Sequence, residues 1–125
     1  ETMKICIVGS RSVDKPEIVI PIIDKFIQEQ VVGTPVFISG GAKGVDQISR
    51  EYAKNHGYDF VEFLPYHLLD PSTEFSSKYF FIRTKQIIDN ADKVLAIWDG
   101  KSKGTEYSIK YSQKKNIPVM VIKAL

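Results

Sequence analysis

The sequence predicts a single three-layer α/β domain, built on a five-stranded parallel sheet with helices on both faces. Short apolar runs alternate with stretches of helical periodicity, which is typical of parallel strands joined by right-handed crossovers. The apolar runs are continuous rather than alternating, as expected for strands that are covered on both faces. We expect the strand order 3-2-1-4-5 and one domain over residues 1–125, with no structural role assigned to Glu1 and Thr2.

Proline and glycine bound the elements of the first half. The first strand is expected at residues 4–8. Pro16 opens the first helix, because proline is well tolerated in the first helical turn, and Gly33 ends it. The second strand follows at 36–38. The second helix is expected at 44–55, where apolar residues share one helical face and a glycine follows the end.

The elements of the second half follow the same alternation. The third strand is expected at residues 60–63. Ser72 or Thr73 caps the third helix, which reaches Ala91. The remaining strand, helix and strand are expected at 93–98, 105–115 and 118–122.

Three of the apolar runs end in loops of small residues. These loops are residues 9–11 after the first strand, 39–46 after the second and 99–105 after the fourth. In the expected strand order they lie along one edge of the sheet, beside the switch point where open α/β sheets bind ligands. Glycine lets the backbone approach an anion, and free N–H groups at a helix start can hold it. The sequence therefore predicts a site for a phosphate-bearing small molecule.

Composition limits the expected cellular location and the expected classes of ligand. The formal net charge is only +2, so bulk electrostatics do not indicate a nucleic-acid binder. The single cysteine, Cys6, lies in an apolar run and is expected to be a buried hydrophobe. No signal peptide or membrane span is visible, so we expect a cytoplasmic protein without membrane contact. Neither His56 nor His67 has a second histidine or cysteine at ligand spacing, so no metal site is expected.

The loop sequences resemble those of a known superfamily. Gly9-Ser10-Arg11, then the segment Ser39 to Asp46, then Trp98 to Thr105 are similar in order and combination to the SLOG superfamily. That group includes the DNA-processing protein DprA, the Lonely Guy phosphoribohydrolases and small YpsA-like proteins. The chain most resembles the YpsA-like branch, a domain of unknown function, over about residues 4–122. The resemblance implies a Rossmann-like fold that binds nucleotides or nucleotide-derived ligands.

The phosphoribohydrolase motif is matched only in part. Arg83 stands nine residues before Asp92, which is the spacing of that motif, but Thr84 takes the place of its lysine. The loop after the fourth strand has no proline and is longer, and Ser108 stands where the resemblance would place the catalytic glutamate. We therefore expect binding, as a sensor or sequestering domain, ahead of catalysis.

Two alternatives stay open. The first is hydrolysis of an N-glycosidic bond in a nucleotide, for which Asp99 and Glu106 are the candidate carboxylates. The second is a DprA-like nucleic-acid-binding module, which the charge of +2 does not favour. No cofactor is expected beyond the nucleotide-type ligand. The last helix and the aromatic-rich third helix could pair subunits in a homo-oligomer.

The candidate ligand-binding residues belong to the three loops, apart from one arginine on the third helix. They are Gly9, Ser10, Arg11, Ser39, Gly40, Gly41, Lys43, Gly44, Asp46, Arg83, Asp99, Gly100, Ser102, Gly104 and Thr105.

Several candidates have a structural alternative. Asp46 either caps the second helix or holds a ribose hydroxyl, and Thr105 either caps the last helix or binds phosphate. Asp99 either caps its turn or takes part in acid–base chemistry. Arg83 stands among apolar neighbours and needs a partner, which is either a ligand anion or a carboxylate in Asp92 or Asp99. Arg11 either binds phosphate or makes a surface salt bridge.

Overall fold

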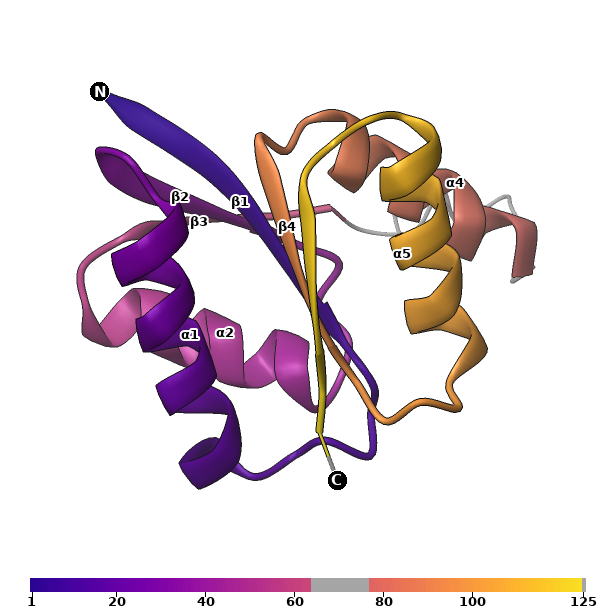
Figure 1. Ribbon diagram of the computed structural model, residues 1–125, viewed down its shortest axis with the longest axis horizontal. Helices are drawn as coiled ribbons and strands as arrows, with labels where there is room; N and C mark the ends of the chain where they lie inside the picture. The colour runs from indigo at the N-terminus through magenta and orange to yellow at the C-terminus, as the bar shows by residue number, and fades with distance from the viewer. Residues whose placement is uncertain (64–76, 125) are drawn as a thin grey trace, which may run out of the picture.

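The computed structural model describes residues 1–63 and 77–124 and has the expected three layers (Figure 1). Five parallel strands form one sheet in the order β3-β2-β1-β4-β5. The predicted fold class and strand order are confirmed. The strands are β1 (Thr2–Gly9), β2 (Thr34–Ser39), β3 (Asp59–Glu62), β4 (Lys93–Trp98) and β5 (Val119–Lys123). The helices are α1 (Pro16–Gln30), α2 (Val45–Asn55), α4 (Ser77–Asp89) and α5 (Lys103–Lys114).

Two element boundaries differ from the expectation in an instructive way. Thr2 belongs to β1 and pairs with Thr34, whose N–H donates to the carbonyl oxygen of Glu1 at 3.0 Å. Leaving Glu1 and Thr2 without a structural role was therefore wrong, because the parallel ladder with β2 extends to the first residues. Helix α5 begins at Lys103 rather than at Thr105. The expected caps of the third helix, Ser72 and Thr73, lie outside the described residues.

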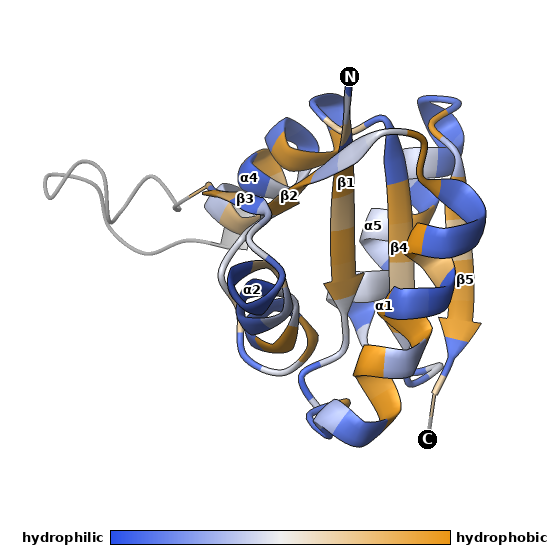
Figure 2. Cartoon of the chain, turned by 90° about the vertical axis from the view of Figure 1, so that its left-hand side faces the viewer, coloured by the Kyte–Doolittle hydropathy of each residue, from blue (hydrophilic) through white to orange (hydrophobic). Residues whose placement is uncertain are grey.

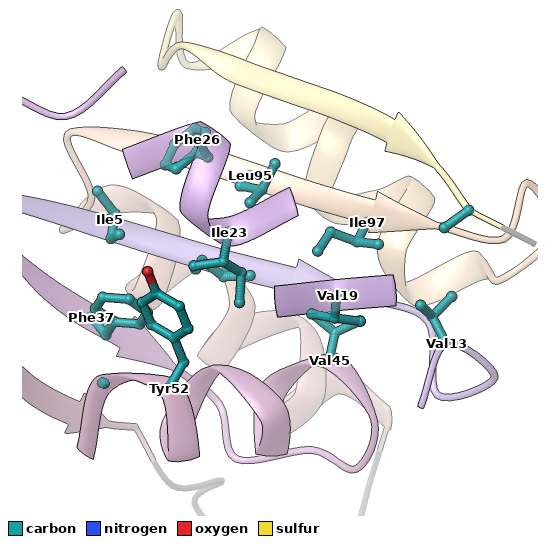
Figure 3. Packing of buried hydrophobic residues seen from close by; sticks show 13 residues of the cluster. Ile5, Val13, Val19, Ile23, Phe26, Phe37, Val45, Tyr52, Leu95 and Ile97 are labelled. Carbon is teal, nitrogen blue, oxygen red and sulfur yellow. The ribbon is translucent and has the colours of Figure 1, made fainter. Parts of the chain in front are cut away.

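The two faces of the sheet carry separate hydrophobic clusters, because side chains alternate along each strand. Helices α1 and α2 cover one face, where Ile5 and Ile7 of β1 pack with Ile23 and Phe26 of α1 (Figures 1 and 3). Helices α4 and α5 cover the other face. The buried hydrophobic cluster there consists of Cys6, Ile38, Ile87, Ile88 and Val94.

Burial of the strands fits their apolar sequence. Figure 2 shows hydrophobic residues concentrated along β1, β4 and β5. Cys6 is fully buried, and burial raises the pKa of its thiol well above the ordinary range, as expected for an inert hydrophobe. Among the helices that the structure describes, none is long and apolar enough to cross a membrane.

Candidate functional site

A cavity of about 430 Å³ opens at the carboxyl edge of the sheet. Residues of all three small-residue loops line it, so the structure brings these loops together as the strand order predicted. The fourth wall comes from α4. The predicted residues on the wall are Gly9, Ser10, Arg11, Gly40, Asp46, Arg83, Asp99, Ser102, Gly104 and Thr105.

Ser10 ties together the loops that follow β1 and β4, which lie near each other in Figure 1. Its hydroxyl oxygen lies 2.8 Å from the hydroxyl oxygen of Ser102 and accepts a hydrogen bond from the N–H of Asp99 at 3.0 Å. Its own N–H donates to the carbonyl oxygen of Ile97 at 3.1 Å. The side chain is almost fully buried, at 2% exposure. Ser10 therefore fixes the relative position of two walls of the cavity.

Asp99 closes the turn between β4 and α5. Its Oδ1 accepts hydrogen bonds from the N–H groups of Lys101 and Ser102, both at 2.8 Å, and its Oδ2 accepts one from the hydroxyl of Ser12 at 2.7 Å. These donors, the N–H of Ser102 first, hold the pKa of the carboxyl well below its usual range. The geometry is that of a turn-capping carboxylate, which is one of its two predicted roles.

The first turn of α5 forms part of the cavity wall. Ser102 occupies the N-cap position, so the alternative in which Thr105 caps this helix is wrong. The expected start of the helix was two residues late, which is why the cap was misplaced. Gly104 and Thr105 line the cavity, and N–H groups in a first helical turn have no acceptor within the helix. Ser108, also on the wall, donates its hydroxyl to the carbonyl oxygen of Gly104 at 3.1 Å.

The loop between β2 and α2 is shaped by two glycines with positive φ. Gly41 has φ +74° and Gly44 has φ +78°, a region that other residues rarely adopt. A Cβ atom on Gly44 would lie 3.0 Å from the carbonyl oxygen of Arg11, so the loops after β1 and β2 approach each other closely here. The N–H of Gly41 donates to the hydroxyl of Ser39 at 3.2 Å. These two glycines shape the loop from outside the cavity wall.

Asp46 is a buried carboxylate on the cavity wall, 9% exposed. It does not cap α2, whose N-cap is Gly44 and has no side-chain cap bond. Instead its Oδ2 accepts a hydrogen bond from the N–H of Ala42 at 3.0 Å, which closes the loop. Burial raises the pKa of Asp46 to about 6, against the opposing pull of the Ala42 N–H and the Arg83 charge. The group therefore changes its protonation state close to neutral pH.

Arg83 reaches from α4 to the β2–α2 loop. Its Nη1 donates to the carbonyl oxygen of Gly40 at 3.0 Å, and its guanidinium lies 5.3 Å from the centre of the Phe80 ring. Its Nε is buried and has no hydrogen-bond partner within residues 1–63 and 77–124. Burial lowers the pKa of Arg83, while the nearby carboxylate of Asp46 opposes that shift. A buried N–H donor without an acceptor is energetically costly, and this cost falls on an arginine that lines the cavity.

The structural alternative for Arg83, an ion pair with Asp92 or Asp99, is wrong. Asp92 accepts a hydrogen bond from the N–H of Lys4 at 2.8 Å, and the Asp99 oxygens are engaged within their own turn and by Ser12. In the described part of the chain no ion pair joins Arg83 to either carboxylate.

Some predicted residues lie beside the cavity rather than on its wall. Glu106, a candidate catalytic carboxylate, pairs with Lys110 at 3.6 Å along the surface of α5 and does not line the cavity. Among the candidate ligand-binding residues, the same holds for Ser39, Gly41, Lys43, Gly44 and Gly100.

Sequence reasoning missed most of the α4 wall. Phe80, Thr84 and Ile87 line the cavity together with Arg83. Their spacing of i, i+3, i+4 and i+7 from Phe80 is that of one helical face, and this signal could have found them. The other wall residues that were not predicted are Val8, Ser12, Ala42, Phe81, Ile88 and Ser108.

Comparison with known proteins gives one family match and two similar structures. A family model described as the YspA, cpYpsA-related SLOG family matches residues 3–67. No curated protein matches the chain. DNA processing protein A from Helicobacter pylori, whose structure is described in terms of single-stranded DNA binding, aligns with a TM-score of 0.74 at 21% identity. The alignment covers 98% of this chain and 66% of that one, so this chain spans just under two thirds of its length.

The second similar structure is TM1055, a structural-genomics target. It aligns with a TM-score of 0.67 at 22% identity, over 94% of this chain and 72% of that one. At these identities both likenesses concern the fold: a Rossmann-like parallel sheet with flanking helices.

Proposed function

Because the chain belongs to the YspA, cpYpsA-related SLOG family, we propose that its cavity binds a nucleotide or a nucleotide-derived, phosphate-bearing small molecule. The domain would act as a sensor of that molecule or sequester it. One observation carries the proposal: the first turn of α5 and the side chain of Arg83 line the same cavity.

The chemistry of the wall suits a phosphate. The first-turn N–H groups of Gly104 and Thr105 and the hydroxyl of Thr105 can donate hydrogen bonds to an anion, which the helix dipole also favours. Arg83 adds a positive charge and a planar set of donors. Arg11, exposed at the rim, adds a second charge. The cavity volume, about 430 Å³, lies in the ordinary range of small-molecule sites, about 300–1,000 Å³.

Calorimetric titration with the four nucleoside 5′-monophosphates tests the proposal. We expect saturable binding that Arg83→Gln weakens by about 10- to 150-fold, the range for losing a hydrogen bond to a charged group. Arg50→Gln is the matched control, because Arg50 pairs with Glu62 at 3.4 Å and does not line the cavity. Absence of binding at millimolar nucleotide, or equal loss in both variants, would contradict the proposal.

A second candidate function is hydrolysis of the N-glycosidic bond of such a nucleotide. Water would add to the anomeric carbon as the carbon–nitrogen bond breaks, and the departing base would take up a proton. Asp46 favours this candidate, because it is a buried carboxylate with a pKa near 6 on the cavity wall. Chromatography for free base after incubation with nucleoside monophosphates tests it, with Asp46→Asn expected to remove the activity.

Binding of nucleic acid is an alternative that the neighbouring structure raises. DNA processing protein A shares the fold at 21% identity, and its reported subject is single-stranded DNA. The formal charge of +2 gives this chain little bulk attraction to a polyanion. A mobility-shift experiment over a salt series distinguishes nucleic-acid binding from nucleotide binding. Tight, strongly salt-dependent binding of an oligonucleotide, with no binding of mononucleotides, would favour nucleic acid as the ligand.

A further inference from the structure

Phe81 is an exposed aromatic residue on the wall of the cavity. It is 39% exposed, and it lines the cavity together with Phe80. Exposing a large apolar ring to water is unfavourable, and such a ring beside polar groups at a cavity is typical of a ligand contact. Most of the other wall residues are small or polar. A phosphate is bound by positive charges and hydrogen-bond donors, and the ring of Phe81 supplies neither, so it would contact a different part of the ligand.

The ring of Phe81 is held in place from two sides. It meets the Phe80 ring edge-on, with centroids 5.4 Å apart at 82°, and it lies against Tyr107 of α5 at 4.6 Å and 57°. These contacts restrict the ring before any ligand arrives, so little conformational entropy remains to be lost on binding. A fixed flat surface of this kind suits a flat, rigid partner.

The same aromatic group is joined to the proposed anion site. The guanidinium of Arg83 lies 5.3 Å from the centre of the Phe80 ring. A Cβ atom on Gly104 would lie 3.1 Å from Cζ of Phe80, so the ring packs directly on the first turn of α5. Phe80 thus touches both groups proposed to hold the phosphate and also contacts Phe81. The anion-binding groups, Phe80 and Phe81 therefore follow one another along the wall. A ligand with an anionic end and an aromatic end would match this arrangement.

We propose that Phe81 stacks against the base of the bound nucleotide, so that the site selects a base-bearing phosphate over a plain sugar phosphate. The inference rests on the proposed function, because the phosphate must first be held beside Arg83. It adds a specificity-determining residue and narrows the ligand class to molecules that carry an aromatic heterocycle.

The test compares two ligands that differ only by the base, adenosine 5′-monophosphate and ribose 5-phosphate. In the unmodified protein we expect the nucleotide to bind about 5- to 150-fold more tightly, the range for stacking one base on an aromatic side chain. Phe81→Leu should reduce this ratio to about 1–3, because it weakens the binding of adenosine 5′-monophosphate far more than that of ribose 5-phosphate. Phe81→Tyr, which keeps the ring, should restore the ratio.

Phe60→Leu is the matched control. Phe60 of β3 also lies near an arginine, with the Arg50 guanidinium 6.0 Å from its ring centre, but it does not line the cavity. The control variant should keep the full ratio. Equal loss in both variants would overturn the inference, because it would show a general effect on folding.

Two further outcomes separate this inference from the proposed function. Equal binding of the two ligands to the unmodified protein would overturn the role of Phe81 while leaving phosphate binding in place. No binding of either ligand would overturn both. A change of oligomeric state in Phe81→Leu, measured by light scattering, with an unchanged ligand ratio would instead assign the ring to a contact between copies of the chain and overturn the inference.

Discussion

Arg83 and Gly40 are joined by a hydrogen bond of 3.0 Å from Nη1 of the arginine to the glycine carbonyl oxygen, across 43 residues of sequence. A Cβ atom at position 40 would lie only 3.0 Å from both Cζ and Nε of Arg83. The glycine therefore leaves room for the guanidinium against the loop. Gly40 is a predicted ligand-binding residue, and the contact gives it a second role, which is to position the arginine.

Gly40→Ala should reduce the free energy of nucleotide binding by more than it reduces the free energy of unfolding. The added methyl group pushes the guanidinium away from its place, and the effect appears in a calorimetric titration. Gly57→Ala is the control: position 57 has φ +71° and open space around a Cβ, so the change strains the backbone without touching the cavity. It should cost about 1 kcal/mol of unfolding free energy and leave binding intact. Parallel losses of binding in both variants would contradict this account of Gly40.

Asp46 should make the protein less stable as the pH rises. Its pKa is about 6 in the folded state against an ordinary value of 3.8, so its contribution to stability is complete below pH 3.8 and is lost as the pH rises through 6. Asp46→Asn removes the charge and retains an acceptor for the Ala42 N–H. We expect this variant to gain about 1–3 kcal/mol in unfolding free energy at pH 8. It should also lose the fall in unfolding free energy that Asp46 causes between about pH 4 and 7. Urea unfolding over this pH range measures both effects.

Asp46→Ala distinguishes charge from hydrogen bonding at the same position. It also removes the buried charge, but it leaves the Ala42 N–H without its acceptor. Asp46→Ala should therefore be less stable than Asp46→Asn at every pH. If the two variants were equally stable, the hydrogen bond to Ala42 would not contribute to the fold.

The surroundings of Asp46 show which features the sequence predicts and which it does not. The fold followed from the alternation of continuous apolar runs and amphipathic stretches. The meeting of the three loops followed from the rule that parallel strands end at one edge. The protonation behaviour of Asp46 did not follow, because it depends on burial and on the distant side chains of Arg83 and Glu62. A carboxylate in a first helical turn looks the same in sequence whether it is exposed or buried.

Helix α4 shows the second limit. An arginine among apolar neighbours needs a partner, and the sequence offers Arg83 either a ligand anion or a carboxylate in Asp92 or Asp99. The packing angle of α4 against the sheet decides that Arg83 meets the carbonyl of Gly40 instead, whereas the Phe80 ring lies three residues earlier on the same helix. That angle is set by contacts between elements far apart in the chain, which local periodicity does not specify.

Ser10→Ala should loosen the link between the loops after β1 and β4. It removes the acceptor of the Asp99 N–H and the hydroxyl partner of Ser102, and Ser10 itself is nearly fully buried. We expect a loss of about 1–3 kcal/mol in unfolding free energy, together with weaker nucleotide binding. Ser12→Ala removes one hydrogen bond from an exposed hydroxyl to Asp99 and should have a much smaller effect. Equal effects on thermal unfolding would show that burial of Ser10 does not matter.

Gly9→Ala should destabilise the protein through packing rather than through the ligand. A Cβ atom at position 9 would overlap the side chain of Val45 and lie 2.7 Å from the carbonyl oxygen of Ile97. Gly9 lines the cavity, yet its lack of a side chain also allows α2 to pack on β1. We expect a loss of about 1–3 kcal/mol in unfolding free energy.

The double variant Gly9→Ala with Val45→Ala tests this reason directly. Removing the two methyl groups of Val45 relieves part of the overlap, so the double variant should be more stable than the sum of the single effects predicts, by at least about 0.5 kcal/mol. Rescue should stay incomplete, because the carbonyl oxygen of Ile97 belongs to the backbone of β4 and cannot move aside alone. Strict additivity in chemical unfolding would mean that Val45 does not set the requirement for glycine at position 9.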